Sequence, residues 1–371
     1  MRIAVLGAAG TMAQVVLRDL LEFVPAVEIT AADRMPVESP DARVRPATVD
    51  VRDEDATARL LDGHDAVLNC VTYYLNVPVM RAALAARVPY ADLGGLYHGS
   101  VKQFALHDDF ERAGVPALLG MGSTPGITNV MAGELARGLD EVHAIHVRVA
   151  SLDRAAVSSG PLPVPYALDT VLDEFSLEPM VVRNGRAEAV PPMSGRETIQ
   201  FPEPIGPVEA IYTLHSEVAM FPRSFPGLRE VSFKVAFEPE FTRKLAFLVE
   251  LGFASREKLG GCSPRDVLLA LAAAQTAPVG DPDDCDVLRV DLEGRHNGES
   301  LHRRAEMVVL PHPEWKVAAG SLDTGVPLSI AGQLLASGAV GAPGVHCPEL
   351  AVPAELFFEM LERRHMRVHW S

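Results

Sequence analysis

Small residues near the start of the chain have the spacing of a phosphate-binding loop. Gly7 and Gly10 follow a short apolar run, and Ala13 completes a Gly-x-x-Gly-x-x-Ala pattern. Glycine permits a tight turn and a close approach of a ligand, and free N–H groups at a helix start favour phosphate. We therefore expect Gly7, Gly10, Thr11, Met12 and Ala13 to hold the pyrophosphate of a dinucleotide. The alternative is an ordinary glycine turn of an α/β protein, because the commoner spacing is Gly-x-Gly-x-x-Gly.

Polar residues at two later strand ends fit the adenosine half of such a ligand. Asp33 ends an apolar run about 20 residues after the glycine loop, where an acidic side chain binds a ribose hydroxyl. Asp33 favours NAD, whereas the neighbouring Arg34 could receive the 2′-phosphate of NADP. A solvated strand end is the alternative for Asp33. Asp50 and Val51 could flank the adenine ring.

Two further loops carry groups suited to a nicotinamide and to proton transfer. Cys70, Val71 and Tyr73 follow the fourth apolar run, and we assign them to the cofactor site. Tyr73 and Tyr74 could pack against the nicotinamide, cap a substrate amine, or only pack under a loop.

Oxidation of an amine needs a base that removes the ammonium proton before hydride loss. Asp92, His98 and Tyr74 are the catalytic candidates, because they lie in loops near the expected ligand crevice. Asp92 could instead hold a cationic amine, and His98 could be a solvated loop histidine.

Six apolar runs, read as strands, alternate with helical patterns, and the loops named above follow the ends of these strands. They predict a parallel sheet with right-handed crossovers and ligands at the carboxyl ends of the strands. The expected strands are Arg2–Leu6, Val27–Ala32, Ala47–Val51, Ala66–Cys70, Pro89–Leu93 and Val115–Leu119, and Glu38–Pro46 is expected to be a proline-rich loop.

Composition narrows the class of protein. The 371 residues are 48% hydrophobic and 22% charged, with a formal charge of −16 and no basic run, which argues against nucleic acid or an anionic membrane as partner. The acidic balance would attract a cationic small substrate, or it only promotes solubility. Cys70, Cys262, Cys285 and Cys347 lack paired spacing, which predicts reduced thiols and no metal site. Without a signal peptide or a membrane-length apolar run, we expect a soluble cytoplasmic protein.

Longer motifs resemble the saccharopine dehydrogenase family. Gly120-Met121-Gly122-Ser123-Thr124-Pro125-Gly126-Ile127-Thr128-Asn129 resembles its Gly-x-x-Pro-Gly-Ile-x-Asn signature, and the segment 90–95 fits the same family. The segments 182–185, 206–210, 223–226, 264–269 and 344–349 look like parts of bacterial lysine 6-dehydrogenases. The resemblance covers essentially the whole chain, and it implies a Rossmann domain, a substrate domain and a homodimer. The glycine loop and the segment 212–216 depart from the lysine 6-dehydrogenase pattern.

The second half of the chain predicts an α+β substrate domain with antiparallel strands. We expect Arg223 to bind a substrate carboxylate through its guanidinium fork, and Glu209 and Thr213 to hold the α-amino end. Arg183 is a weaker carboxylate candidate in a hairpin turn, and His215 is a further acid–base candidate.

These observations predict a Rossmann-type doubly wound sheet with a second α+β substrate and dimerisation domain. The nucleotide-binding domain should comprise residues 1–138 and 318–371, and the substrate domain residues 139–317. In the last segment, Pro327–Ser337 and Pro353–Arg363 are expected to be amphipathic helices. The expected activity is NAD(P)-dependent oxidation of the terminal amine of an amino acid, similar to lysine 6-dehydrogenase. The alternatives are a saccharopine-type reductase, which joins an amino acid to a semialdehyde through a secondary amine, and a non-catalytic dinucleotide-binding sensor or scaffold.

Overall fold

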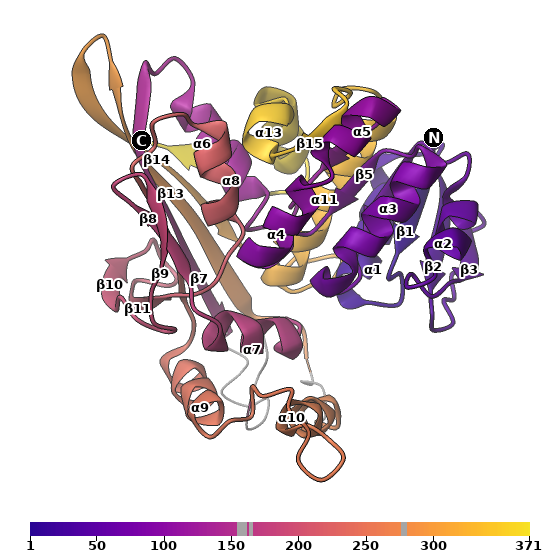
Figure 1. Ribbon diagram of the computed structural model, residues 1–371, viewed down its shortest axis with the longest axis horizontal. Helices are drawn as coiled ribbons and strands as arrows, with labels where there is room; N and C mark the ends of the chain where they lie inside the picture. Colours follow the sequence, from indigo (N-terminus) through magenta and orange to yellow (C-terminus); the bar gives the residue numbers. More distant parts are fainter. Residues whose placement is uncertain (154–161, 163–165, 276–279) are drawn as a thin grey trace.

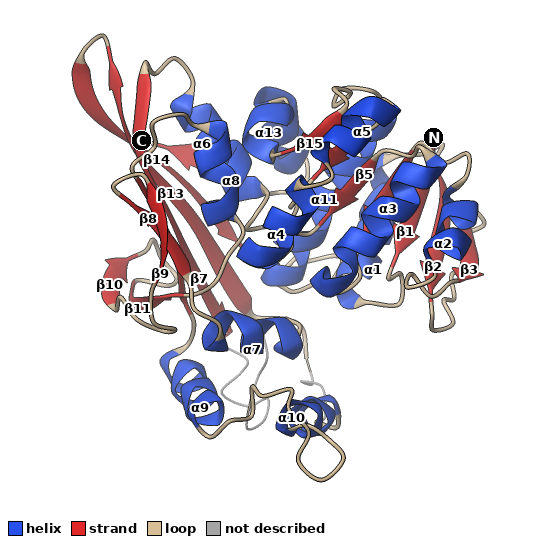
Figure 2. Ribbon diagram, viewed as in Figure 1, coloured by secondary structure: helices blue, strands red, loops and turns tan. Residues whose placement is uncertain are grey.

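Two β-sheets with their own helices lie side by side in the computed structural model (Figure 1). The structure describes residues 1–153, 162, 166–275 and 280–371. In Figure 2 the first sheet and its helices lie on the right, and the long strands of the second sheet lie on the left. Within the described ranges, no helix has both the length and the apolar character needed to cross a membrane.

The first sheet is parallel, with seven strands in the order β15-β6-β5-β4-β1-β2-β3. Its strands are β1 (Arg2–Leu6), β2 (Glu28–Asp33), β3 (Val44–Thr48), β4 (Ala66–Asn69), β5 (Tyr90–Asp92), β6 (Pro116–Leu118) and β15 (Gly344–His346). This order confirms the predicted Rossmann-type sheet, in which the strand order reverses between β1 and β4. β15 returns from the end of the chain to pair with β6.

The third strand lies earlier than expected. The prediction was Ala47–Val51, with Pro46 in a loop, but β3 contains Pro46. β3 forms the edge of the sheet, where proline is tolerated because one side of the strand has no partner to bond.

Helices cover both faces of the first sheet, with α1 and α11 on one face and α2, α3 and α5 on the other. The helices of this half are α1 (Thr11–Phe23), α2 (Glu54–Leu61), α3 (Asn76–Ala86), α4 (Leu96–Phe104), α5 (His107–Ala113), α6 (Ile127–Ala136), α11 (Ala319–Ala336), α12 (Pro348–Ala351) and α13 (Ala354–Glu362), with a 3₁₀ turn at Tyr73–Leu75.

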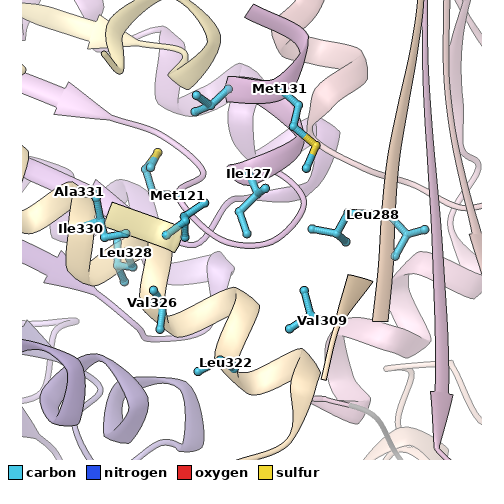
Figure 3. Packing of buried hydrophobic residues seen from close by; sticks show 14 of the residues in the cluster. Met121, Ile127, Met131, Leu288, Val309, Leu322, Val326, Leu328, Ile330 and Ala331 are labelled. Atoms are coloured by element: carbon cyan, nitrogen blue, oxygen red, sulfur yellow. The ribbon is translucent and has the colours of Figure 1, made fainter. Parts of the chain in front are cut away.

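α11 corrects a second expectation. The prediction started this helix at Pro327, but α11 begins at Ala319 and contains Pro327. Most of its residues are buried, so packing on several sides compensates for the backbone hydrogen bond that proline removes. Figure 3 shows Leu322 and Val326 of α11 in the packed core, with Leu288 and Val309 of the second sheet nearby. One hydrophobic cluster is therefore continuous between the two halves of the chain.

The second sheet is mixed, whereas only antiparallel pairs were expected. Its main path is β10-β11-β12-β7-β13-β14-β16, and β12 runs parallel to β7. Its strands are β7 (Glu141–Asp153), β8 (Met180–Arg183), β9 (Arg186–Ala189), β10 (Glu197–Gln200), β11 (Pro207–Tyr212), β12 (Glu230–Ala236), β13 (Asp284–His296), β14 (Glu299–Val309) and β16 (Val368–Trp370). The associated helices are α7 (Leu168–Ser176), α8 (Glu217–Ser224), α9 (Pro239–Glu250) and α10 (Pro264–Ala273).

Strand alternation gives this sheet two different faces. Val149, Phe233 and Leu288 point to the core that the two halves share. Val287 and the neighbouring side chains of β7 and β12 point to the opposite face, which Phe201 and the β10–β11 hairpin cover. The face toward the first sheet also carries polar side chains near the ends of β7 and β13, including Ser151, Asp284 and Asp286.

Candidate functional site

The loop after β1 is shaped to receive a phosphate group. Gly7 has a φ of +76°, and a Cβ on it would lie 2.9 Å from the carbonyl carbon of Cys70. Gly10 caps α1 without a side-chain hydrogen bond, and the first turn carries no acidic residue. The N–H groups at the start of α1 are therefore available to an anion. Binding of a cofactor by Thr11, Met12 and Ala13 stays a prediction.

Asp33 orders this loop from the end of β2. Its carboxylate accepts hydrogen bonds from the N–H groups of Ala9, at 3.1 Å, and Met35, at 2.9 Å. Arg34 next to it is exposed. These positions match the expected ribose site, and the exposed guanidinium leaves room for either nicotinamide dinucleotide.

Asp50 and Val51 follow β3 beside this site. Arg52 donates from Nε to the Asp50 carboxylate at 2.9 Å, and the hydrogen bonds from Arg52 lower the pKa of Asp50 to about 2. Val51 is buried in the hydrophobic cluster that includes Val49 and Leu61, so it anchors the loop after β3.

A cavity of about 1340 Å³ opens between the carboxyl ends of the first sheet and the second sheet. Met12, Cys70, Val71 and Tyr73 of the predicted cofactor residues line it, which puts the nicotinamide end of a dinucleotide toward this space. Its far wall is the core face of the second sheet, including Phe233.

The Pro125–Gly126 motif forms the next part of the wall. A Cβ on Gly126 would lie 2.0 Å from the carbonyl oxygen of Gly122, so only glycine fits this turn. Thr124 and Thr128 of the same motif donate hydrogen bonds to the carboxylate of Glu217. The motif therefore positions a buried acid of the second half of the chain.

Glu217 is paired with His215, which lines the cavity. His215 Nδ1 contacts the Glu217 carboxylate, and its ring stacks on Phe233 with a centroid distance of 3.8 Å. Burial by itself would lower the pKa of His215, but the charge of Glu217 and the hydrogen bond to it raise that pKa overall. An oriented histidine on a cavity wall is a suitable proton donor and acceptor.

Glu174 is a second titratable group of the same wall. Tyr166 donates a hydrogen bond to its carboxylate, and burial raises the pKa of Glu174 to about 7. Glu174 is one of eight carboxyl groups among the described lining residues, and those residues include no lysine or arginine. The eight are Asp153, Asp169, Glu174, Asp281, Asp283, Asp284, Asp286 and Asp323. Asp169 pairs with Arg265 and Asp281 pairs with Lys316, and both of these cations lie outside the lining. The lining itself stays acidic, which favours a cationic ligand.

Two tyrosines connect the halves of the chain at this cavity. Tyr73 donates from its hydroxyl to Asp173 Oδ2 at 2.8 Å, and Asp173 Oδ1 accepts from Arg265 at 2.7 Å. Tyr74 also contacts Asp173, and the Arg256 guanidinium lies 4.8 Å from the Tyr74 ring centroid. Tyr73 lines the cavity, whereas Tyr74 is exposed on its outer side.

The three predicted catalytic residues lie outside the cavity lining. Asp92 is fully buried, and its carboxylate accepts from Tyr90, Gly94 and Gly120 at 2.8–2.9 Å. It fixes the loops after β5 and β6 instead of facing a ligand. His98 is exposed on α4. Their position argues against direct contact with a substrate in this cavity.

The three predicted substrate residues also lie away from the lining. Arg223 is exposed, and its guanidinium lies 4.4 Å from the Phe104 ring centroid. Glu209 on β11 pairs with Arg196. Thr213 is buried, and its hydroxyl has no hydrogen-bond partner in the described part of the chain. Arg183, the weaker candidate, pairs with Glu188 in an exposed hairpin.

Potential metal ligands gather at one place in the described chain. His107, Asp108 and Glu111 on α5 have ligand atoms within 4.8 Å of one another. Both carboxylates are exposed, and His107 Nδ1 already contacts the backbone of Val345. This group does not line the cavity, and we assign no metal chemistry to it.

Comparison with known proteins covers both halves of the chain. Residues 3–118 match the saccharopine dehydrogenase NADP binding domain, and residues 122–366 match the saccharopine dehydrogenase C-terminal domain. The chain is 25% identical over 267 residues to the carboxyaminopropylagmatine dehydrogenase of Synechocystis sp., covering 68% of this chain and 66% of that protein. It is 24% identical over 302 residues to the carboxynorspermidine synthase of Vibrio cholerae, covering 76% of this chain and 71% of that protein. The matches thus span about two thirds of these relatives' lengths.

A solved structure extends the comparison to the complete fold. The apo saccharopine dehydrogenase (L-Glu forming) from Saccharomyces cerevisiae superposes with a TM-score of 0.72 at 15% identity, covering 100% of this chain and 99% of that one. This likeness shows a common fold.

Proposed function

The chain belongs to the saccharopine dehydrogenase family of NAD(P)-dependent oxidoreductases, and we propose that it reduces an imine to a secondary amine. The imine would form from an amine and a carbonyl compound. The observation that carries this proposal is the His215–Glu217 pair on the wall of a large acidic cavity. That cavity begins at the predicted cofactor residues Met12 and Val71.

The residues around the glycine loop fit a nicotinamide dinucleotide. Gly7 and Gly10 leave space for a pyrophosphate, and Asp33 stands where a ribose would lie. The bound cofactor supplies a hydride, or accepts one in the reverse reaction. The protein's own contribution is to orient the amine and to manage one proton.

His215 would act as the proton donor and acceptor. In the reductive direction, it gives a proton to the imine nitrogen while a hydride reaches the imine carbon, so that C=N becomes CH–NH. In the oxidative direction, it takes the proton of the amine. Because Nδ1 is engaged by Glu217, the other ring nitrogen, Nε2, is the atom assigned to this transfer.

One observation supports a secondary amine over oxidation of free lysine: the relatives are named for carboxyaminopropylagmatine and carboxynorspermidine. Oxidation of a terminal amine remains the second candidate for the same site.

The test is a comparison of two reactions in one spectrophotometric assay. We expect NADPH or NADH oxidation when an amino-acid semialdehyde is mixed with amines such as putrescine or agmatine. Reduction of NAD(P)⁺ by lysine alone would favour the second candidate. Cofactor binding without turnover in either direction would favour the non-catalytic sensor.

A further inference from the structure

Three carboxyl groups meet at the edge of the cavity where β13 and α11 come together. Asp284 and Asp286 lie on one face of β13, and Asp323 lies on α11. Ser123 donates a hydrogen bond to Asp323 Oδ2 at 2.9 Å, and the Gly320 N–H donates to Asp284 Oδ2 at 3.4 Å. Ser151 hydrogen bonds to Asp286, so each of the three carboxyl groups has at least one neighbour that holds it.

Two oxygens of this cluster have no hydrogen-bond donor in the described part of the chain. Asp284 Oδ1 and Asp286 Oδ1 are both buried atoms without a hydrogen-bond partner among the residues that the structure describes. The Asp286 side chain is well buried, with 7% of its surface exposed, and it lines the cavity. A buried carboxylate oxygen without a donor is unfavourable, and it indicates a partner that binds from the cavity.

No protein cation compensates these charges within the described ranges. Other buried aspartates have one: Arg364 pairs with Asp19, and Arg265 pairs with Asp173. No ion pair of this kind joins the β13–α11 cluster in the described part of the chain. Burial and mutual repulsion raise the pKa of Asp323, and burial raises that of Asp286 to about 7.

We propose that Asp284, Asp286 and Asp323 form a subsite for a second cationic group of the substrate, an ammonium or guanidinium at a distance from the reacting nitrogen. This subsite rests on the proposed function, because it assigns the opposite end of the same substrate. It selects an extended dication over a monoamine, and over an amine that carries a carboxylate.

The sheet register sets the length of such a substrate. His215 stacks on Phe233, which is level with Val147 on β7, whereas Asp286 is level with Ser151. Phe233 on β12 and Asp286 on β13 are therefore separated by two strand spacings across the sheet and by the four residues from 147 to 151 along it. These spacings put the Cα atoms of Phe233 and Asp286 roughly 16 Å apart. Both side chains project into the cavity between these points, so a linear diamine or polyamine suits the gap.

Binding of three matched amines tests the subsite without relying on turnover. Cadaverine, pentylamine and lysine have the same five-carbon backbone, and they differ in one amino group or one carboxylate. With the NADP⁺-loaded full chain in calorimetry, we expect cadaverine to bind at least about tenfold tighter than either other amine, since one additional charge contact accounts for such a factor.

Two substitutions on β13 test whether Asp286 causes the preference for cadaverine. Asp286→Asn should reduce cadaverine affinity to that of pentylamine and leave pentylamine unchanged. Asp291→Asn, on the opposite face of β13, is the control and should preserve the preference. Equal affinity for cadaverine and pentylamine in the unmodified protein, or equal weakening of both by Asp286→Asn, would overturn the subsite. Displacement of cadaverine by micromolar Ca²⁺ or Mg²⁺ would overturn it in favour of a metal site.

The two proposals fail in different ways. Charge discrimination without any C–N oxidoreduction would reject the proposed function and leave the subsite standing. Turnover that is indifferent to the second amino group would reject the subsite alone.

Discussion

Asp286→Asn should stabilise the protein at alkaline pH and leave it unchanged at acid pH. Burial raises the pKa of Asp286 from 3.8 to about 7. The folded protein therefore keeps a proton that the unfolded chain has already released between these two values. Because the folded state binds more protons, the free energy of unfolding falls as the pH rises through this interval.

The magnitude follows from the same two values. At about 1.36 kcal/mol for each pH unit, the interval between 3.8 and about 7 corresponds to about 4 kcal/mol at pH 8. Asparagine has nearly the same shape and no charge, so the substitution should recover up to this amount above pH 7. It should recover almost nothing near pH 4, where Asp286 is protonated in the folded state.

Urea unfolding followed by tryptophan fluorescence at pH 4, 6 and 8 measures the difference. Asp291→Asn is the control, because Arg304 donates to the Asp291 carboxylate at 2.6 Å and its loss should give no alkaline gain. A variant that is less stable at all three pH values, or equally stabilised at all of them, would refute the reasoning. It would show that Asp286 is not a buried and uncompensated acid.

Three further substitutions have distinct expected outcomes. His215→Gln should lower kcat by about 10²- to 10⁴-fold with a small change in KM, and it should flatten the dependence of kcat on pH. His296→Gln, at an exposed position, is the control, and an unchanged kcat in His215→Gln would contradict the role of His215 in proton transfer. Gly7→Ala should abolish cofactor binding in a fluorescence titration, because the new Cβ would lie 2.9 Å from the carbonyl carbon of Cys70 at a φ of +76°. Retained affinity would argue against the loop after β1 as the pyrophosphate site. Arg364→Met should cost about 3–5 kcal/mol in denaturant unfolding, because it leaves Asp19 buried without its partner; a loss below 1 kcal/mol would contradict this expectation.

Local patterns predicted the elements around the expected cofactor loop. The Gly7–Ala13 loop and Asp33 depend on a strand, a turn and a helix that are contiguous in sequence, and the structure has these elements where they were expected. The binding roles of these residues stay predictions. The edge strand β3 and the helix α11 were misplaced because proline was taken as a boundary. Tertiary context overrode the local signal at both positions.

The substrate half could not be located in the same way. Asp92 follows a strand of the first sheet as expected, but four hydrogen-bond donors engage its carboxylate, which therefore supports two loops. Arg223 has the right chemistry, yet α8 carries it away from the cavity. Conversely, His215 and Asp286 meet the cavity only through the packing of the second sheet on α11, which no local spacing encodes.

A signal for the acidic subsite was present in the sequence. Asp281, Asp283, Asp284 and Asp286 form a dense acidic run, and the net charge of −16 was compatible with a cationic substrate. Strand alternation would have placed Asp284 and Asp286 on one face. The homodimer and the cytoplasmic location stay predictions.

The central claim, imine reduction to a secondary amine, is tested most directly by the mass of the product. The protein is incubated with an amino-acid semialdehyde, a diamine such as putrescine, and NADPH carrying deuterium at both C4 positions. The account predicts a product with the mass of the two substrates less one water, plus one hydrogen and one deuterium, with the deuterium on the carbon next to the new secondary nitrogen. Absence of deuterium from any coupled product, together with NADP⁺ reduction by lysine, would contradict it.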